Sequence, residues 1–163
     1  MIIGIMEIDV LIEAGFEEYI DAGWLKLVAE RVLTIQNTDV SAELSLVISP
    51  QEKMRRLNLS YLGEDEPTDV LSFPMLPEQA AADSVAFVAP PDGVQHLGEI
   101  IISYPQAVIQ ARERQHPVKR EIATLIIHGT LHLLGYDHDT PERERERKAR
   151  EATILSDIEG VIE

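Results

Sequence analysis

The stretch that decides the fold is residues 98–138, GEIIISYPQAVIQARERQHPVKREIATLIIHGTLHLLGYDH. Its first segment, Gly98–Ser103, is rich in isoleucine and predicts a β-strand. Two helices are expected next, over Pro105–Gln115 and Pro117–Leu134, each with a proline near its start. From Ile122 to Leu134 the second helix carries only four polar side chains, so it is apolar nearly all round and is expected to be buried.

The segments around this stretch predict three more strands and three more helices. The strands are expected at Ile2–Val10, Ala42–Ile48 and Thr68–Phe73, and the helices at Glu18–Gln36, Pro50–Leu62 and Pro141–Asp157. Pro50 and Pro141 would each occupy a first helical position, with Thr140 as the N-cap of the last helix. Because Pro74 cannot donate a hydrogen bond to a ladder, the strand before it is expected at a sheet edge.

Length and composition favour one domain. A chain of 163 residues with 45% apolar side chains can bury one sizeable core, so a single domain over residues 1–163 is expected. The expected fold class is α+β with α/β-like features, built from a mixed sheet of about four strands and roughly five helices. The first residues carry Glu7, Asp9 and Glu13 and lack a basic start, which favours neither a signal peptide nor a membrane span. A cytoplasmic location is expected.

Charge and cysteine content limit the chemistry. The net charge is −15, and the absence of cysteine excludes disulfides, Cys-type zinc fingers and iron–sulfur sites. The charge is uneven, because residues 1–100 hold 18 Asp/Glu and 5 Lys/Arg, whereas residues 101–163 hold 11 and 9. An anionic ligand is therefore expected near the cations that flank the buried helix, which are Arg112, Arg114, Lys119 and Arg120.

The histidines of the buried helix predict a metal site. His128 and His132 are four residues apart, about 400° of helix rotation, so both rings project from one face. Gly135 can adopt the left-handed conformation that ends a helix, which would bring His138 back toward the same point. Three imidazoles leave one open position on a tetrahedral zinc ion, where a zinc-bound water with a pKa of about 7 could act as nucleophile. One Zn²⁺ per chain is expected.

The same histidine and glycine spacing occurs in metzincin proteases, which carry a glutamate directly after the first histidine as the general base. This chain has Gly129 at that position. Peptide hydrolysis would therefore lack its usual base, so the metal site must serve another reaction or recruit a base from elsewhere in the chain.

The stretch from His128 to His138, HGTLHLLGYDH, resembles the signature of the YbeY family of bacterial rRNA-maturation factors. Two upstream blocks agree in order and spacing, Leu57-Asn58 through PTDVLSF at 67–73, and LGEIIIS at 97–103. The resemblance implies a zinc-dependent, single-strand-specific endoribonuclease with a sheet and helices around one metal cleft, and with His128, His132 and His138 as ligands. It also implies roles in 16S rRNA 3'-end maturation and ribosome quality control. The partners implied are single-stranded RNA, rRNA and the ribosome or ribosomal proteins, without a membrane.

The resemblance places the strand that holds Asp69 beside the metal cleft, where this carboxylate could order the bound water. Asp137 is the other candidate catalytic carboxylate. The family pattern has an arginine directly after the position of Tyr61, whereas this chain has Leu62, which predicts reduced nuclease activity. Arg55, about two helical turns earlier, could replace that arginine only in part. RNA contacts are expected from Arg55, Arg112, Arg114, Lys119 and Arg120.

Plainer interpretations apply to other polar residues. The run PERERERK at 141–148 alternates in charge sign and favours a solvated helix face over an RNA-binding arm. His96 and His116 are expected as surface or capping residues. Two alternative functions remain: a zinc-dependent protease or amidase, weakened by Gly129, and a ribosome-associated binding module in which a fourth protein ligand closes a structural zinc site.

Overall fold

The structure, a computed structural model, describes residues 6–36, 41–63, 68–74, 94–136 and 140–162. The strands within these ranges are β1 (Met6–Ile12), β2 (Ser41–Ser49), β3 (Val70–Pro74) and β4 (Val94–Ser103). The helices are α1 (Ala22–Ile35), α2 (Gln51–Leu62), α4 (Tyr104–Arg114), α5 (Val118–Leu133), α6 (Pro141–Asp157) and α7 (Glu159–Ile162). The predicted α+β class with a four-stranded sheet is confirmed.

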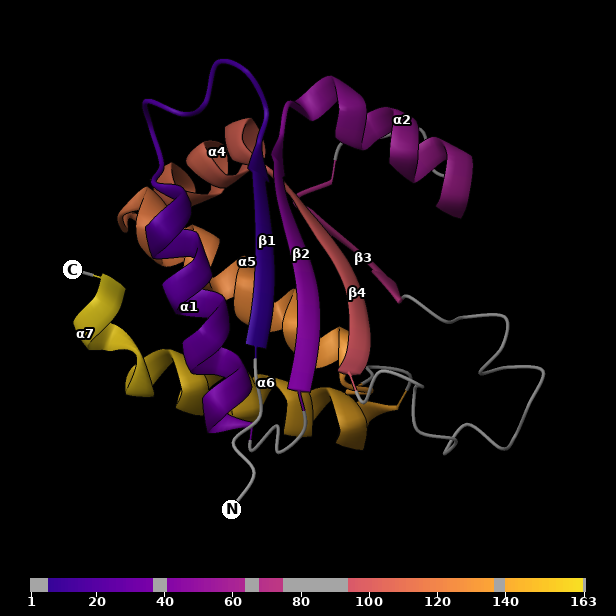
Figure 1. Cartoon of the computed structure of the whole chain (residues 1–163), viewed down its shortest axis with the longest axis vertical. Helices are drawn as coiled ribbons and strands as arrows, with labels where there is room; N and C mark the ends of the chain where they lie inside the picture. Colours follow the sequence, from indigo (N-terminus) through magenta and orange to yellow (C-terminus); the bar gives the residue numbers. More distant parts are fainter. Residues whose placement is uncertain (1–5, 37–40, 64–67, 75–93, 137–139, 163) are drawn as a thin grey trace.

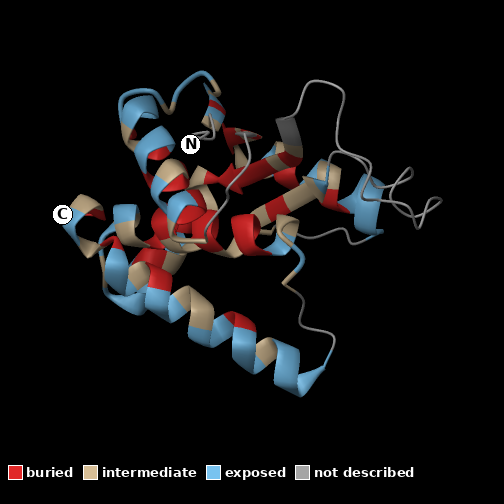
Figure 2. Cartoon of the chain, turned by 60° about the horizontal axis from the view of Figure 1, so that its bottom comes forward, coloured by how far each residue is buried: buried red, intermediate tan, exposed pale blue. Residues whose placement is uncertain are grey.

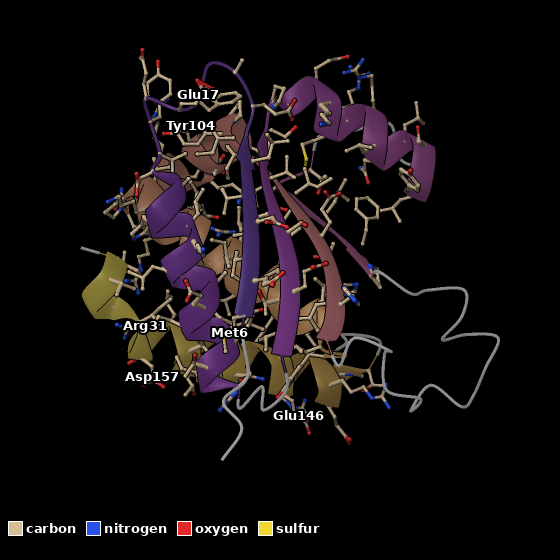
Figure 3. All side chains as sticks on the ribbon, in the orientation of Figure 1. Met6, Glu17, Arg31, Tyr104, Glu146 and Asp157 are labelled. Atoms are coloured by element: carbon tan, nitrogen blue, oxygen red, sulfur yellow. The ribbon has the colours of Figure 1, made fainter. Side chains whose placement is uncertain are left out.

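The sheet is mixed, with the strand order β1-β2-β4-β3 (Figure 1). Strands β1, β2 and β4 are parallel, and β3 runs antiparallel to β4. The parallel strands run from the end of the sheet marked by Met6 toward the end where α4 begins at Tyr104 (Figure 3). The prediction that Pro74 closes an edge strand is confirmed, because β3 pairs only with β4 among the described strands.

Apolar side chains cover both faces of the sheet because successive residues of a strand point to opposite sides. Leu46 of β2 and Ile100 of β4 are register partners and belong to the larger core, which includes buried side chains of α1 and α5. Their neighbours Val47 and Ile101 face the other side and pack in a smaller core with Met54 of α2. The sheet is therefore covered by α1 and α5 on one face and partly by α2 on the other.

Helix α5 is buried along most of its length, as its nearly continuous apolar sequence predicted. It packs on β3 and β4 and is also in contact with α1, α4 and α6. Helix α6 lies on the outside and is exposed along most of its surface (Figure 2). Its predicted start is confirmed, because Pro141 is the first helical residue and the Thr140 hydroxyl accepts a hydrogen bond from the Arg143 N–H at 3.1 Å.

Some predicted boundaries were wrong. Helix α1 begins at Ala22 and not at Glu18, because the Asp21 carboxylate accepts a hydrogen bond from the Trp24 N–H at 2.9 Å and so caps the helix. Pro50 precedes α2 as its N-cap, with an extended ψ of 159°, and is not its first helical residue. The short helix α7 was not predicted. Residues 2–5 of the first expected strand lie outside the described residues.

None of the helices in the described ranges is long and apolar enough to cross a membrane.

Candidate metal centre and the adjoining cleft

Gly129 lets α5 pack closely against the sheet. A Cβ atom at this position would lie 2.9 Å from Cγ2 of Ile100 and 3.0 Å from Oγ of Ser72. Because both distances are well below ordinary van der Waals contact, the side chain of another residue would not fit there without movement. This close approach holds the helix segment with His128 and His132 against the edge of the sheet.

A cleft of about 780 Å³ lies at this edge, between α2, β3 and α5. Both histidines line it, in agreement with the i,i+4 spacing that predicted a shared helix face. The other described residues of the lining come from α2, β3 and β4: Leu57, Tyr61, Leu62, Val70, Leu71, Ser72, Phe73, Pro74, Glu99 and Ile101. The described wall is thus mostly apolar and aromatic, with two imidazoles and one carboxylate.

Two side chains of α6 contact the Nδ1 atom of the His128 ring. Its Nδ1 atom lies 2.9 Å from Oε2 of Glu151 and 2.9 Å from Nη1 of Arg147, and Arg147 also donates to the Glu151 carboxylate. Burial raises the pKa of Glu151, but the hydrogen bond and charge of His128, together with Arg147, outweigh burial and hold that pKa below its ordinary value. Glu151 is therefore a carboxylate at neutral pH.

Glu151 at Nδ1 favours the tautomer that carries its proton on Nδ1 and leaves the lone pair on Nε2, whereas Arg147, which can only donate, favours the opposite tautomer. Histidines that bind a metal through one ring nitrogen commonly donate a hydrogen bond from the other ring nitrogen to a carboxylate. In the tautomer that Glu151 favours, His128 can offer Nε2 to a cation, with His132 lining the same cleft. The predicted third ligand His138 and the predicted carboxylate Asp137 lie outside the described residues. Within the described ranges, no three His, Cys, Asp or Glu side chains are grouped so that they could hold a metal.

Asp69, the other predicted catalytic carboxylate, is half-buried just before β3. Its backbone carbonyl accepts a hydrogen bond from the Ser103 N–H at 2.9 Å, which starts the pairing of β3 with β4. The described cleft lining contains the carboxylate of Glu99 but not that of Asp69. The catalytic role of Asp69 stays a prediction.

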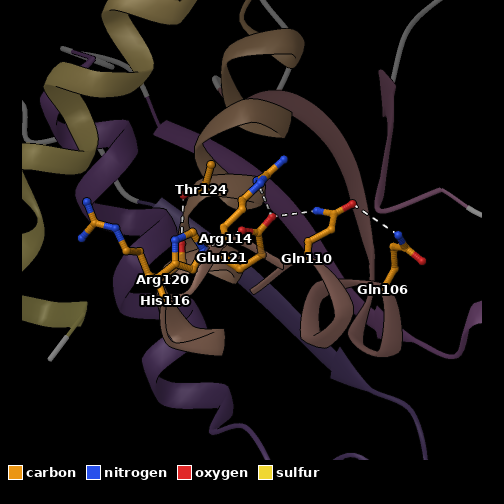
Figure 4. Close-up of polar contacts among 7 residues, drawn as sticks. All are labelled: Gln106, Gln110, Arg114, His116, Arg120, Glu121 and Thr124. Atoms are coloured by element: carbon orange, nitrogen blue, oxygen red, sulfur yellow. Dashed lines mark hydrogen bonds and ion pairs between the residues drawn. The ribbon is translucent and has the colours of Figure 1, made fainter. Parts of the chain in front are cut away.

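Glu121 of α5 is fully buried and engages one of the predicted RNA-contact residues. Arg114 Nη1 donates to its Oε2 at 2.8 Å, and Nε2 of His116 lies 2.7 Å from its Oε1 (Figure 4). The prediction of His116 as a surface or capping residue was wrong, because the ring is a half-buried partner of a buried carboxylate. His96 likewise pairs with a carboxylate, since its Nδ1 lies 3.0 Å from Oε1 of Glu43 on the neighbouring strand.

Two further cations are also held by neighbours. Arg120 Nη1 donates to Oε1 of Glu159 at 2.7 Å, and Lys119 Nζ lies 5.3 Å from the ring centroid of Trp24, within cation–π range. The described cleft lining includes none of the five residues predicted to contact RNA, which are Arg55, Arg112, Arg114, Lys119 and Arg120. Their contacts with RNA stay a prediction.

Three features of the site were missed from the sequence. Glu99 could have been noticed, because it directly precedes the isoleucine run at 100–102 of a central strand, where carboxylates are rare. Glu151 gives no local signal, since it is one of many charged residues in α6 and meets His128 only through the packing of α6 on α5. Tyr61 and Phe73 lie in segments quoted for the family resemblance, but nothing in the sequence brings their rings together.

Comparison with known proteins agrees with this arrangement. The family model described as endoribonuclease YbeY matches residues 14–159. A Dehalococcoides mccartyi protein named endoribonuclease YbeY is 46% identical, over 97% of this chain and 93% of that protein. A Roseiflexus protein with the same name is 40% identical, over 91% of this chain and 90% of that protein.

The fold also has a solved counterpart. The solution structure of a Thermotoga maritima protein superposes with a TM-score of 0.57 and 23% identity, over 94% of this chain and 92% of that one. At this identity the likeness concerns the fold alone. The family model and the relatives cover nearly the whole chain, and they place the cleft and both histidines inside the matched region. The chain therefore belongs to the endoribonuclease YbeY family.

Proposed function

We propose that this protein is a metal-dependent endoribonuclease that cleaves single-stranded RNA in the cleft between α2, β3 and α5. One observation carries the proposal: His128 and His132 line one cleft, and a carboxylate, Glu151, lies at Nδ1 of His128 on the side of the ring opposite Nε2. Family membership supports RNA as the substrate. A single hydrolase domain over residues 1–163 is part of the proposal.

The donors present fit a zinc ion. Imidazole suits zinc, copper or nickel better than magnesium, and the absence of cysteine leaves His, Asp and Glu as the possible side-chain ligands. We propose one Zn²⁺ per chain, held by His128, His132 and His138. When bound, the ion would supply Lewis acidity, which polarises a phosphate oxygen and lowers the pKa of a water molecule.

The chain's own residues would position the substrate and move protons. Glu151 and Arg147 would hold the His128 ring in one orientation. Glu99 is a carboxylate inside the cleft and could accept a proton from an attacking water, a role for which Asp69 and Asp137 also remain candidates.

The environment of Gly129 argues against the protease alternative. In the metzincin pattern a glutamate follows the first histidine, but here the sheet fills the space that such a side chain would need. The other alternative is a structural zinc site with four protein ligands, which would leave no open position for catalysis. The number of coordinating side chains in a metal-bound structure would distinguish this structural site from a catalytic one.

The proposed biological role is 16S rRNA 3'-end maturation and ribosome quality control, in the cytoplasm and in contact with the ribosome or ribosomal proteins. Membership of the endoribonuclease YbeY family supports this role. Contacts with RNA from Arg112, an exposed cation in the last turn of α4, would add to those in the cleft.

The test is cleavage of single-stranded RNA by the purified protein, with and without a chelator, together with its zinc content. We expect about one zinc per chain, activity that the chelator removes and zinc restores, and loss of both in a His128→Ala, His132→Ala double variant. His96→Ala is the matched control, because His96 is not among the described cleft residues. Zinc content unchanged in the double variant would contradict the proposal.

A further inference from the structure

Two aromatic rings lie together on the wall of the cleft. Tyr61, in the last turn of α2, is 67% exposed although it is a large apolar side chain. Its ring centroid is 5.1 Å from that of Phe73 on β3, with an angle of 58° between the rings. The next residue in the chain, Leu62, is 61% exposed and lines the same cleft. An exposed apolar group of this kind beside a concave site indicates a ligand surface.

The composition of the wall limits what this surface can recognise. The described lining contains no lysine or arginine, and the protein carries a net charge of −15. Phosphate groups are therefore not the part of a nucleotide that these residues attract. These residues instead attract the flat, uncharged, polarisable ring of a base. Stacking on an aromatic side chain requires only a π-face and works for every base.

We propose that Tyr61 and Phe73 form a binding site for one unstacked nucleobase of the substrate strand, an inference that rests on the proposed nuclease function. Tyr61 is the stacking face, and Phe73 fixes the orientation of the Tyr61 ring through their tilted contact. The occupant is a nucleobase and not the apolar side chain of a protein partner, because the same cleft holds the two histidines. A base bound here belongs to the strand whose backbone reaches those histidines.

This site gives a physical reason for preferring single strands. In a duplex both faces of a base are covered by its neighbours, so the base must leave the stack before a side chain can lie against it. An unpaired strand presents its bases without that cost. Tyr61 is thus a positioning residue for the RNA, and its removal should weaken binding more than it slows the chemical step.

The test uses the zinc-loaded protein and three variants: Tyr61→Leu, Tyr61→Trp and Tyr19→Leu. Tyr19 is the matched control, because it is 62% exposed and also contacts an aromatic ring, that of Tyr104, on the β1 side of the sheet (Figure 3). Two ligands of equal length are compared, a single-stranded RNA that contains 2-aminopurine and a ribose-phosphate chain without bases. Fluorescence of 2-aminopurine reports stacking, and cleavage kinetics separate KM from kcat.

We expect Tyr61→Leu to lose the fluorescence quenching and to raise KM about tenfold with little change in kcat. Tyr61→Trp should retain quenching and affinity, and Tyr19→Leu should behave as the parent. The chain without bases should bind the parent and Tyr61→Leu equally. The proposal is overturned if Tyr61→Leu binds RNA as tightly as the parent, if Tyr19→Leu loses as much affinity, or if the chain without bases binds the parent as tightly as RNA.

The nuclease proposal and the base-site proposal can fail independently of each other. Quenching that depends on Tyr61 in a protein that never cleaves RNA would support the base site and refute the nuclease. Cleavage that is indifferent to Tyr61 would support the nuclease and refute the base site.

Discussion

Replacement of Gly129 by alanine tests whether the sheet really fills the space beside the metal-site helix. The added Cβ would lie 2.9 Å from Cγ2 and 3.1 Å from Cδ1 of Ile100, and 3.0 Å from Oγ of Ser72. Ile100 is fully buried in a central strand, so its methyl groups have no solvent to move into. Helix α5 and strand β4 would have to separate by a few tenths of an ångström.

Two opposing terms set the expected change in the free energy of unfolding. Overpacking a close-packed core costs about 1–3 kcal/mol. Alanine in a helix interior recovers about 0.8–1.0 kcal/mol of helix propensity relative to glycine. The net expectation for Gly129→Ala is a loss of about 1 kcal/mol, which lowers the melting temperature of a chain of this length by about 2–4 °C.

The measurement is thermal unfolding of Gly129→Ala beside Gly160→Ala. Gly160 lies in α7, and a Cβ there would meet nothing within 4 Å, so its replacement should leave the melting temperature unchanged or raise it. Gly129→Ala should also cleave RNA more slowly, because a shift of α5 moves both histidines relative to β3. If Gly129→Ala is as stable as Gly160→Ala, the helix is not held against the sheet as described, and the steric argument against a metzincin-type base fails.

Other substitutions probe the surroundings of the cleft. Glu151→Gln should weaken zinc binding about 10–100-fold in a chelator competition. Because the pKa of Glu151 is lowered, its contribution to stability is complete above the ordinary carboxyl pKa and is lost as the pH falls through the lowered pKa, so the parent and Glu151→Gln should unfold alike in acid. Leu62→Arg should raise the rate of RNA cleavage about tenfold without altering zinc content, and an unchanged rate would show that the missing arginine is not catalytic here. Arg114→Glu should cost about 1–3 kcal/mol of stability, because it removes a partner of buried Glu121, whereas Arg112→Glu should weaken RNA binding and leave the melting temperature unchanged.

The parts of this molecule that were predictable from the sequence depend on local periodicity. The apolar run from Ile122 to Leu134 predicted a buried helix, and most of α5 is buried, except where His128 and His132 line the cleft. Pro74 predicted an edge strand, and β3 lies at the edge. The four-residue spacing predicted that His128 and His132 share a face, and both line one cleft. Each of these inferences uses only geometry within one helix or strand.

The parts that could not be predicted depend on contacts between elements distant in sequence. Glu151 lies 23 residues after His128, and only the packing of α6 on α5 brings the carboxylate to the ring. In the sequence, Gly129 indicates only that the catalytic glutamate of metzincins is missing. In the structure, this glycine allows the close approach of α5 to Ile100 and Ser72. A periodicity argument indicates which face a residue occupies, but not how near the next element comes.

The positions of the basic residues connect the fold to the way this acidic protein can bind RNA. Helix α5 is mostly buried between Glu121 and Leu131, so the Glu121 carboxylate at the start of this stretch loses contact with water and needs partners. Arg114 and His116 supply them, and Arg120 and Lys119 are held by neighbours of their own. Three of the five cations that the sequence predicts as RNA contacts, Arg114, Lys119 and Arg120, are thus held by neighbouring side chains. Under the proposed function, the described cleft relies on a metal and on aromatic stacking more than on positive charge, and its affinity for RNA should depend less on salt than that of a basic RNA-binding protein.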